Sequence, residues 1–317
     1  MSSELTRIAN PIYDGPFKYL LDDNRVARLF LSTLIGEDIT ELTFRPTEHR
    51  ADITQRSVTV FRMDFSARIT LPSGEEKLVI IEIQKAKFAT DIMRFRKYLG
   101  AQYASKENTF RSKGHESAMP ILSIYFLGHS LEHTKLPLIR VVRQYQDGAG
   151  NVLPGAKEEF IESLTHDSFI VQIPHLKERR KNDIESLLGI FDQSQKDPRD
   201  AHALSICEED YPEKFQPVIR RLIKAISEPQ VRETMDVEDD FLEDLEDMER
   251  TVATLGSALE EKTAVILEKD AALVKKDAVI EEKDAVIEEK DAVIQKAIQA
   301  LVASGLSEKA ARAMLLG

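Results

Sequence analysis

The sequence predicts an α/β fold, with a mixed central sheet flanked by helices and an all-helical C-terminal extension. Three observations support this prediction. Residues 57–87 alternate apolar and polar side chains around a turn, as a β-hairpin does. Residues 88–106 repeat apolar side chains at helical spacing, and residues 269–295 contain a seven-residue repeat. The order helix, hairpin, helix, strand gives a mixed sheet covered by helices.

The chain opens with a loop and a helix over residues 11–35. Apolar side chains recur there at helical spacing, and Gly36 supplies a residue that commonly ends a helix. A short strand is expected over residues 42–46.

In the hairpin, alternate residues of the first strand are apolar and share one face: Phe61, Met63, Phe65, Ala67, Ile69 and Leu71. Residues 72–74 (Pro-Ser-Gly) have turn chemistry, and the second strand contains an apolar run over residues 78–81. A three-residue loop places Leu71 opposite Glu75 and therefore Asp64 opposite Glu82. Gln84 shares the face of Glu82 because strand residues two apart point the same way.

Two carboxylates and an amide then lie together in a hairpin otherwise built for burial. Like charges opposite one another destabilise a sheet, and unpaired burial destabilises it further, so a cation is expected between them. Mg²⁺ takes one or two carboxylates and retains several waters, which suits this arrangement.

The next helix, over residues 88–106, has an apolar stripe of Phe88, Ile92, Phe95, Leu99 and Tyr103. Arg94, Tyr98 and Gln102 follow a different edge at i, i+4 and i+8, where they can reach one ligand together. The alternative is that Arg94 stacks on Tyr98 at the surface.

Further strands are expected over residues 119–127, 138–145 and 169–173, and further helices over residues 182–191, 211–226 and 237–259. The seven-residue repeat Lys-Asp-Ala-Val-Ile-Glu-Glu that begins at Lys276 and Lys283 predicts a long helix, most simply a coiled coil with a second copy of the chain. Asp277 lies four residues before Glu281, so the helix gains little from its own charges. A solvated single helix is the alternative. Two short helices hinged at residues 304–306 close the chain.

We therefore divide the sequence into a core of residues 1–180, a helical extension of residues 181–227, an acidic helix of residues 228–260, and a heptad-repeat segment of residues 261–317 that ends in a short helical hairpin.

The net charge of −12 is unevenly distributed. Residues 228–250 contain eleven acidic side chains and two arginines, whereas residues 85–113 contain eight basic and two acidic side chains. The basic segment follows the proposed carboxylate site, where a phosphate backbone would need neutralising. A single cysteine, Cys207, indicates a reducing compartment, and we expect a cytoplasmic protein without a membrane span. No glycine-rich phosphate loop is present, so we expect no nucleotide cofactor.

Asp64, seventeen intervening residues and then Glu82-Ile83-Gln84 resemble the motif of the PD-(D/E)XK nuclease superfamily in its glutamine-substituted form. Residues 14–18 (Asp-Gly-Pro-Phe-Lys) and Arg94-x-x-x-Tyr98 resemble its recombination-promoting, transposase-like family. The resemblance covers roughly residues 10–190. It implies a restriction-endonuclease-like core and a Mg²⁺-dependent DNA endonuclease that hydrolyses phosphodiester bonds, with Mn²⁺ or another divalent ion as a possible substitute.

The resemblance also implies residue roles. Asp64, Glu82 and the Ile83 carbonyl would bind the metal, while Gln84 stands at the motif position usually held by lysine. An amide orients water or contacts phosphate but does not take up a proton at neutral pH. Lys18, Lys85 or Lys87 could supply the missing positive charge. Lys85 falls on the opposite face of the strand from Gln84, so Lys18 is preferred, with an ordinary surface lysine as the alternative. The remaining candidates are Arg94, Tyr98, Lys85 and Lys87 for DNA binding, with Asp14 and Gln102 as further members of the site.

Two alternatives remain open. Asp64 could pair with Arg62 or Arg94, and Glu82 with Lys18, in an ion-pair network without catalysis. The chain would then be a silent nuclease-like module that binds DNA or a partner protein and oligomerises through its coiled coil. In that case residues 228–250 could occupy the basic groove and suppress DNA binding.

Overall fold

The computed structural model describes residues 5–45, 48–50, 60–62, 64–85, 91–112, 115–155, 157–177 and 180–316. The chain divides into two compact units, Met1–Glu243 and Asp244–Gly317. The strands are β1 Leu5–Ala9, β2 Glu41–Phe44, β3 Glu48–Arg50, β4 Val60–Arg62, β5 Phe65–Thr70, β6 Glu76–Gln84, β7 Thr109–Ser112, β8 His115–Ala118, β9 Ile121–Leu127, β10 Leu138–Val141, β11 Asp167–Gln172, β12 Lys196–Asp197 and β13 Asp200–Cys207. The α-helices are α1 Asp14–Leu21, α2 Asn24–Ile35, α3 Asp91–Ala104, α4 Glu159–Leu164, α5 Asp183–Leu188, α6 Gln216–Ala225, α7 Pro229–Ala303 and α8 Glu308–Leu316.

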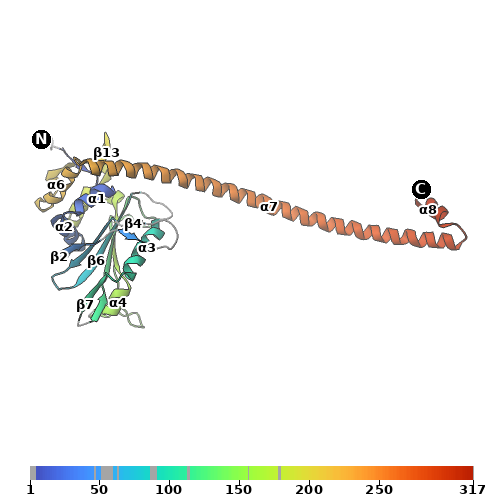
Figure 1. Ribbon diagram of the computed structural model, residues 1–317, viewed down its shortest axis with the longest axis horizontal. Coiled ribbons are helices and arrows are strands. Elements are labelled where there is room, and N and C mark those ends of the chain that lie inside the picture. Colours follow the sequence, from blue (N-terminus) through green and yellow to red (C-terminus); the bar gives the residue numbers. More distant parts are fainter. Residues whose placement is uncertain are drawn as a thin grey trace. The chain divides into compact units, whose positions relative to one another are not determined.

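The first unit is built on a six-stranded mixed sheet with the strand order β10-β11-β9-β6-β5-β2. The central pairs β11–β9 and β9–β6 are parallel, and the outer pairs are antiparallel. Helices α1 and α2 cover one face of this sheet and α3 covers the other (Figure 1). The predicted mixed α/β class is therefore confirmed.

Side chains of β6 alternate between two apolar cores. Val79 and Ile81 join the large core under α1 and α2, whereas Leu78 and Ile80 join a smaller one with Phe95 and Tyr98 of α3. Four phenylalanines, Phe17, Phe30, Phe126 and Phe191, lie ring against ring in the large core, with centroids 4.8–6.3 Å apart. Burial on both faces leaves β6 little freedom to shift, because a slip of one residue would turn every side chain over.

The predicted hairpin is confirmed in its register, but its first strand begins only at Phe65, because Val60–Arg62 pairs with β3 in a separate two-stranded sheet. Phe65 pairs with Ile81 and Thr70 pairs with Glu76. The Leu71 N–H donates to the Glu75 carbonyl at 2.9 Å, and Gly74 has a φ of 83°, which an L side chain rarely adopts. The turn thus occupies residues 72–74, as its sequence indicates.

A second sheet was not expected from the sequence. Strands β1, β13 and β12 form it, and β1 pairs antiparallel with β13 over Leu5↔Cys207 to Ala9↔Ala203. Its partners are almost 200 residues apart, and short strands with such distant partners leave only a weak local pattern. This sheet brings His202 close to the N-terminus of α1, where its ring lies edge-on to that of Tyr13 with centroids 5.0 Å apart.

The apolar stripe predicted for α3 is wrong in its rotation about the helix. Ile92 and Tyr103 are exposed, whereas Phe95, Tyr98 and Gln102 are buried; Phe88 lies outside the described residues. Gln102 tolerates burial because its side-chain oxygen accepts a hydrogen bond from the Asn108 amide at 2.6 Å.

The acidic segment and the seven-residue repeat form one continuous helix, α7. In the second unit the helix turns at Gly305, whose φ is 104°, into α8, and Ile298 and Ala311 are its buried side chains. Among the described residues, no helix is both long and apolar enough to cross a bilayer.

Gly128 fixes the end of β6 against β9. Its N–H donates to the Gln84 carbonyl at 2.6 Å, and a Cβ built on it would lie 2.2 Å from the Lys85 carbonyl oxygen. That neighbour is backbone, so the strand end itself would have to move.

We predict that Gly128→Ala lowers the free energy of unfolding by more than about 3 kcal/mol, because backbone overlap at a strand pair has no inexpensive relief. Gly100→Ala, on the exposed side of α3 with open space around it, is the matched control and should stabilise the helix by about 0.5–1 kcal/mol. Urea unfolding of both variants tests this, and an equal effect of the two changes would contradict it.

Candidate functional site

The hairpin register brings two carboxylates together at one end of the sheet. Asp64 directly precedes β5, so one further step of the β5–β6 pairing places it opposite Glu82. Glu82 is only 4% exposed. By alternation with Leu78 and Ile80, Glu82 belongs to the face that α3 covers. The predicted apposition of the two acidic residues therefore exists in the structure.

Asp64 is bound by backbone and lies close to a lysine. Its Oδ2 accepts the Ile83 N–H at 2.5 Å, and its Oδ1 lies 4.0 Å from the Lys18 ammonium. Burial, followed by the negative charges of Glu82 and Asp14, raises the pKa of Asp64 well above its ordinary value. Lys18 and the Ile83 N–H act in the opposite direction without cancelling that rise. The site therefore favours any cation that can stay between these oxygens.

Cations reach the two carboxylates from both sides of the sheet. Lys18 also binds Asp14, one turn earlier on α1, with its Nζ 2.5 Å from Oδ1 of that residue. From the other face, Arg94 of α3 places a guanidinium nitrogen 3.3 Å from Oε1 of Glu82. The ion-pair network considered from the sequence paired Asp64 with an arginine and Glu82 with Lys18. In the structure Lys18 lies near Asp64 and Arg94 pairs with Glu82.

The other predicted site residues divide into three groups. Gln84 is partly buried at the end of β6, and its side chain has no hydrogen-bond partner among the residues that the structure describes. Tyr98 and Gln102 lie on the buried face of α3, so they do not share a ligand-facing edge with the exposed Arg94. Lys87 lies outside the described residues.

Lys85 has its own partner, which the sequence did not identify. Its ammonium forms an ion pair with Asp239 of α7 and lies 3.5 Å from the centroid of the Tyr13 ring. The Asp239 carboxylate also accepts the Tyr13 hydroxyl at 3.0 Å and lies 2.7 Å from Nε2 of His202. Only the excess of acidic residues in 228–250 hinted at this contact, because nothing local indicates which of them lie beside Lys85.

Glu238, the neighbour of Asp239, contacts the start of α1. Its Oε2 accepts the backbone N–H of Asp14 at 2.9 Å, the position where a helix N-terminus attracts negative charge. Burial is the main cause that raises the pKa of Glu238 to about 7, with Asp14 and Asp239 adding to it. The acidic start of α7 therefore belongs to the surroundings of the site, since the contacts Glu238–Asp14, Asp14–Lys18 and Lys18–Asp64 are continuous.

The residues present fit a hard divalent cation. The donors at the strand ends are carboxylate oxygens, an amide and the Ile83 carbonyl, which are the oxygen ligands that Mg²⁺ prefers. Two carboxylates alone are involved, and within the described ranges no group of three or more His, Cys, Asp or Glu side chains is arranged to hold a metal ion. A metal would therefore bind with water in most positions.

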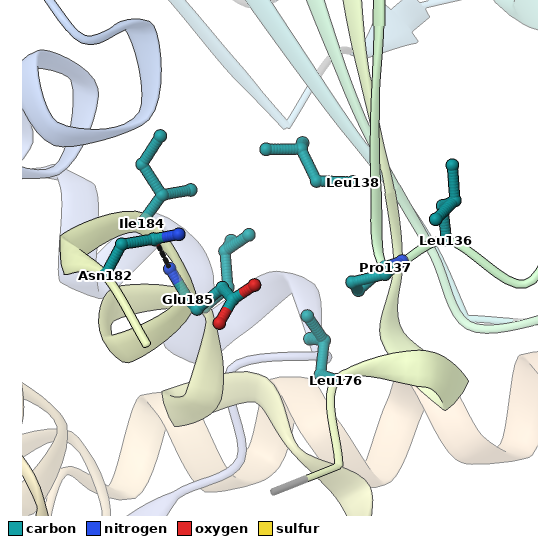
Figure 2. Close-up of a pocket in the computed structure, with 8 residues that line it drawn as sticks. Leu136, Pro137, Leu138, Leu176, Asn182, Ile184 and Glu185 are labelled. Atoms are coloured by element: carbon teal, nitrogen blue, oxygen red, sulfur yellow. Dashed lines mark hydrogen bonds between the residues drawn. The ribbon is translucent and has the colours of Figure 1, made fainter. Parts of the chain in front are cut away.

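An apolar pocket of about 290 Å³ lies elsewhere, between the start of β10 and α5 (Figure 2). Leu136, Leu138 and Leu176 line it together with Ile184 and Leu188. Its polar groups have structural roles: the Asn182 side chain accepts the Glu185 N–H at 2.8 Å and caps α5. The pocket contains no arrangement for proton transfer or metal binding, so the carboxylate pair remains the candidate site.

Comparison with known proteins adds no assignment: no family model, no curated protein and no solved structure matches this chain.

Repulsion at the site predicts that Asp64→Asn stabilises the metal-free protein. The amide oxygen keeps an acceptor for the Ile83 N–H while the charge is lost. Because the folded-state pKa of Asp64 is raised, its contribution to stability is complete below the unfolded-state pKa and is lost as pH rises through the folded-state pKa.

The variant should therefore be more stable than the parent protein at pH 8, and this difference should shrink toward pH 4. Urea unfolding in EDTA at both pH values provides the measurement. A variant that is less stable than the parent at pH 8 would show that the carboxylate is satisfied by Lys18 alone.

Proposed function

We propose that the chain is a metal-dependent DNA endonuclease with a restriction-endonuclease-like core, of the recombination-promoting, transposase-like type. The observation that supports this most is the apposition of Asp64 and Glu82 at adjacent strand ends, with the pKa of Asp64 raised by burial and by Glu82. Such a desolvated carboxylate pair is typical of a site that awaits a cation. The resemblance of Asp64 and Glu82-Ile83-Gln84 to the PD-(D/E)XK motif supports the same proposal.

In this proposal each residue has one role. Asp64 and Glu82 hold the divalent ion, with the Ile83 carbonyl as a further ligand. When bound, Mg²⁺ lowers the pKa of a water ligand and neutralises charge on the scissile phosphate. Lys18 supplies a positive charge 4.0 Å from Asp64, and Arg94 is placed to exchange Glu82 for a phosphate oxygen. Gln84 orients water or phosphate and transfers no proton.

A second candidate is a catalytically silent module that binds DNA or a partner protein. The observation that favours it is the pairing itself: Arg94 contacts Glu82, and Lys18 is bound to Asp14 and close to Asp64. Cations already present at both carboxylates could take the place of a metal. The two candidates differ in whether a divalent ion binds between Asp64 and Glu82.

We predict that the purified protein nicks or linearises plasmid DNA in Mg²⁺ or Mn²⁺, and that Asp64→Ala and Glu82→Ala each abolish cleavage because the ion loses half its carboxylate ligands. Mg²⁺ should also raise the melting temperature of the parent protein, since a ligand that binds only the folded state stabilises it.

That thermal shift should disappear in both variants and persist in Glu107→Gln, a change of the same charge type at an exposed residue. Cleavage that survives in Asp64→Ala would exclude this site. A folded parent protein that shows neither cleavage nor a shift at millimolar Mg²⁺ would favour the silent module.

We further propose that the second unit pairs chains through the repeat in α7. The apolar residues of each repeat are exposed along the helix, among them Val279, Ile280, Val286 and Ile287. The pairs Asp277–Glu281 and Asp284–Glu288 repel within the helix, so an isolated helix gains little from its own charges. A strict seven-residue period suits a left-handed supercoil of two or more copies. Pairing would give a nuclease one site for each DNA strand.

If so, Ile280→Glu combined with Ile287→Glu should reduce the mass in solution from an oligomer to the 35.9 kDa of one chain, because charges would enter the seam. Gln295→Glu with Gln299→Glu adds the same charge at exposed polar positions of α7 and should leave the mass unchanged. Light scattering distinguishes them. A parent protein that is monomeric at micromolar concentration would contradict the pairing.

A further inference from the structure

Beside the candidate site, two adjacent carboxylates of α7 bind groups that attract anions. Glu238 accepts the N–H of Asp14, the first residue of α1, and Asp239 is paired with Lys85, the residue that follows β6. A helix N-terminus and a lysine ammonium are both groups that bind phosphate. Here the chain's own acidic side chains hold them.

The start of α7 packs closely against α1, within the first unit. A Cβ added to Gly15 of α1 would lie 3.1 Å from Cβ of Thr234 and 3.3 Å from the Val231 carbonyl oxygen, so α1 and α7 approach as nearly as a glycine allows. Val231 and Met235 are buried in the large core. This anchors α7 up to the turn that contains Glu238 and Asp239, and the two carboxylates can leave only by rotation of their side chains.

The surroundings of Asp239 suit an anion that accepts several hydrogen bonds at once. One carboxylate gathers the Lys85 ammonium, the Tyr13 hydroxyl and a ring nitrogen of His202 from three separate elements. Its oxygens therefore have the donors that a phosphate group would use. Asp239 is still 41% exposed, so a solvent-borne anion can reach the same place.

We propose that Glu238 and Asp239 stand in for two backbone phosphates of the DNA substrate, so that the start of α7 competes with DNA for Lys85 and the N-terminus of α1. This inference rests on the proposed nuclease function. It identifies a phosphate-binding position outside the Asp64–Glu82 pair and explains why a strongly acidic helix begins next to a site for a polyanion. DNA binds by displacing the two carboxylates while Val231 and Met235 keep α7 docked.

The test compares two double variants that remove the same charge from one helix. Glu238→Gln with Asp239→Asn removes the proposed competitors and keeps hydrogen-bonding groups of the same size. Glu233→Gln with Asp240→Asn removes two exposed charges of α7 that form no side-chain hydrogen bond or ion pair within the described residues. Both are made in full-length protein that also has Asp64→Asn, so that DNA stays intact. Binding of a fluorescent 20-base-pair duplex is followed by anisotropy in Mg²⁺.

We expect the first variant to bind the duplex about tenfold more tightly than the second, and adding Lys85→Gln to remove most of that gain. Equal affinities of the two variants, with measurable binding by both, would overturn the competition while leaving DNA as the substrate. A gain that Lys85→Gln leaves intact would also overturn it. If none of the proteins binds the duplex at micromolar concentration, the proposed function fails, and the competition fails with it.

Asp239→Asn alone is the second variant if the double change disturbs folding, which circular dichroism and thermal unfolding would reveal. It keeps the hydrogen bonds from Tyr13 and His202 possible and removes only the charge opposite Lys85. A smaller gain in affinity, of about threefold, is expected. No gain in a folded Asp239→Asn protein would contradict the role of Lys85.

Discussion

The pairing of β5 with β6 in a single register determines where the acidic residues of this protein lie. Leu78 and Ile80 pack under α3 while Val79 and Ile81 pack under α1 and α2, so the strand is held on both faces. A shift by one residue would exchange the side chains of the two cores and turn Glu82 toward the large apolar core. The turn at residues 72–74 and the glycine contact at Gly128 fix the two ends. With this register fixed, Asp64 and Glu82 lie opposite one another.

The neighbouring helices place positive side chains beside these two carboxylates. Helix α1 places Lys18 near Asp64, and α3 places Arg94 near Glu82, one from each face of the sheet. The pKa of Asp64 nevertheless remains raised, with burial as the main cause. The negative charge of the site is thus compensated only in part. The acidic start of α7 adds further negative charge beside the pair, because Glu238 accepts the Asp14 N–H and Asp239 pairs with Lys85.

Local patterns allowed much of this to be predicted. The period of two in residues 61–71 and the turn residues at 72–74 defined the hairpin, and its register followed by counting. The strand at Ile121–Leu127 and the long helix α7 were likewise visible, as an apolar run and as a repeat. The rotation of α3 was not, because Phe95 fits either of two stripes, and the packing of Tyr98 against Leu78 and Ile80 and the Asn108 partner of Gln102 come from distant segments.

Contacts between distant segments were beyond local patterns. The pairing of β1 with β13 and the ion pair of Lys85 with Asp239 join residues more than 150 positions apart. The acidic composition of residues 228–250 suggested an interaction with a basic groove, but it could not single out Asp239 among eleven acidic residues. The roles of Asp64, Glu82 and Lys18 in catalysis stay predictions, since position alone does not demonstrate chemistry.

The most direct measurement is a crystal structure of the protein grown with Mn²⁺, with anomalous data collected at the manganese absorption edge. We expect one strong peak between the carboxylates of Asp64 and Glu82, within bonding distance of both, with Arg94 turned away from Glu82. No peak at saturating Mn²⁺, with Lys18 and Arg94 still bound to the two carboxylates, would contradict it.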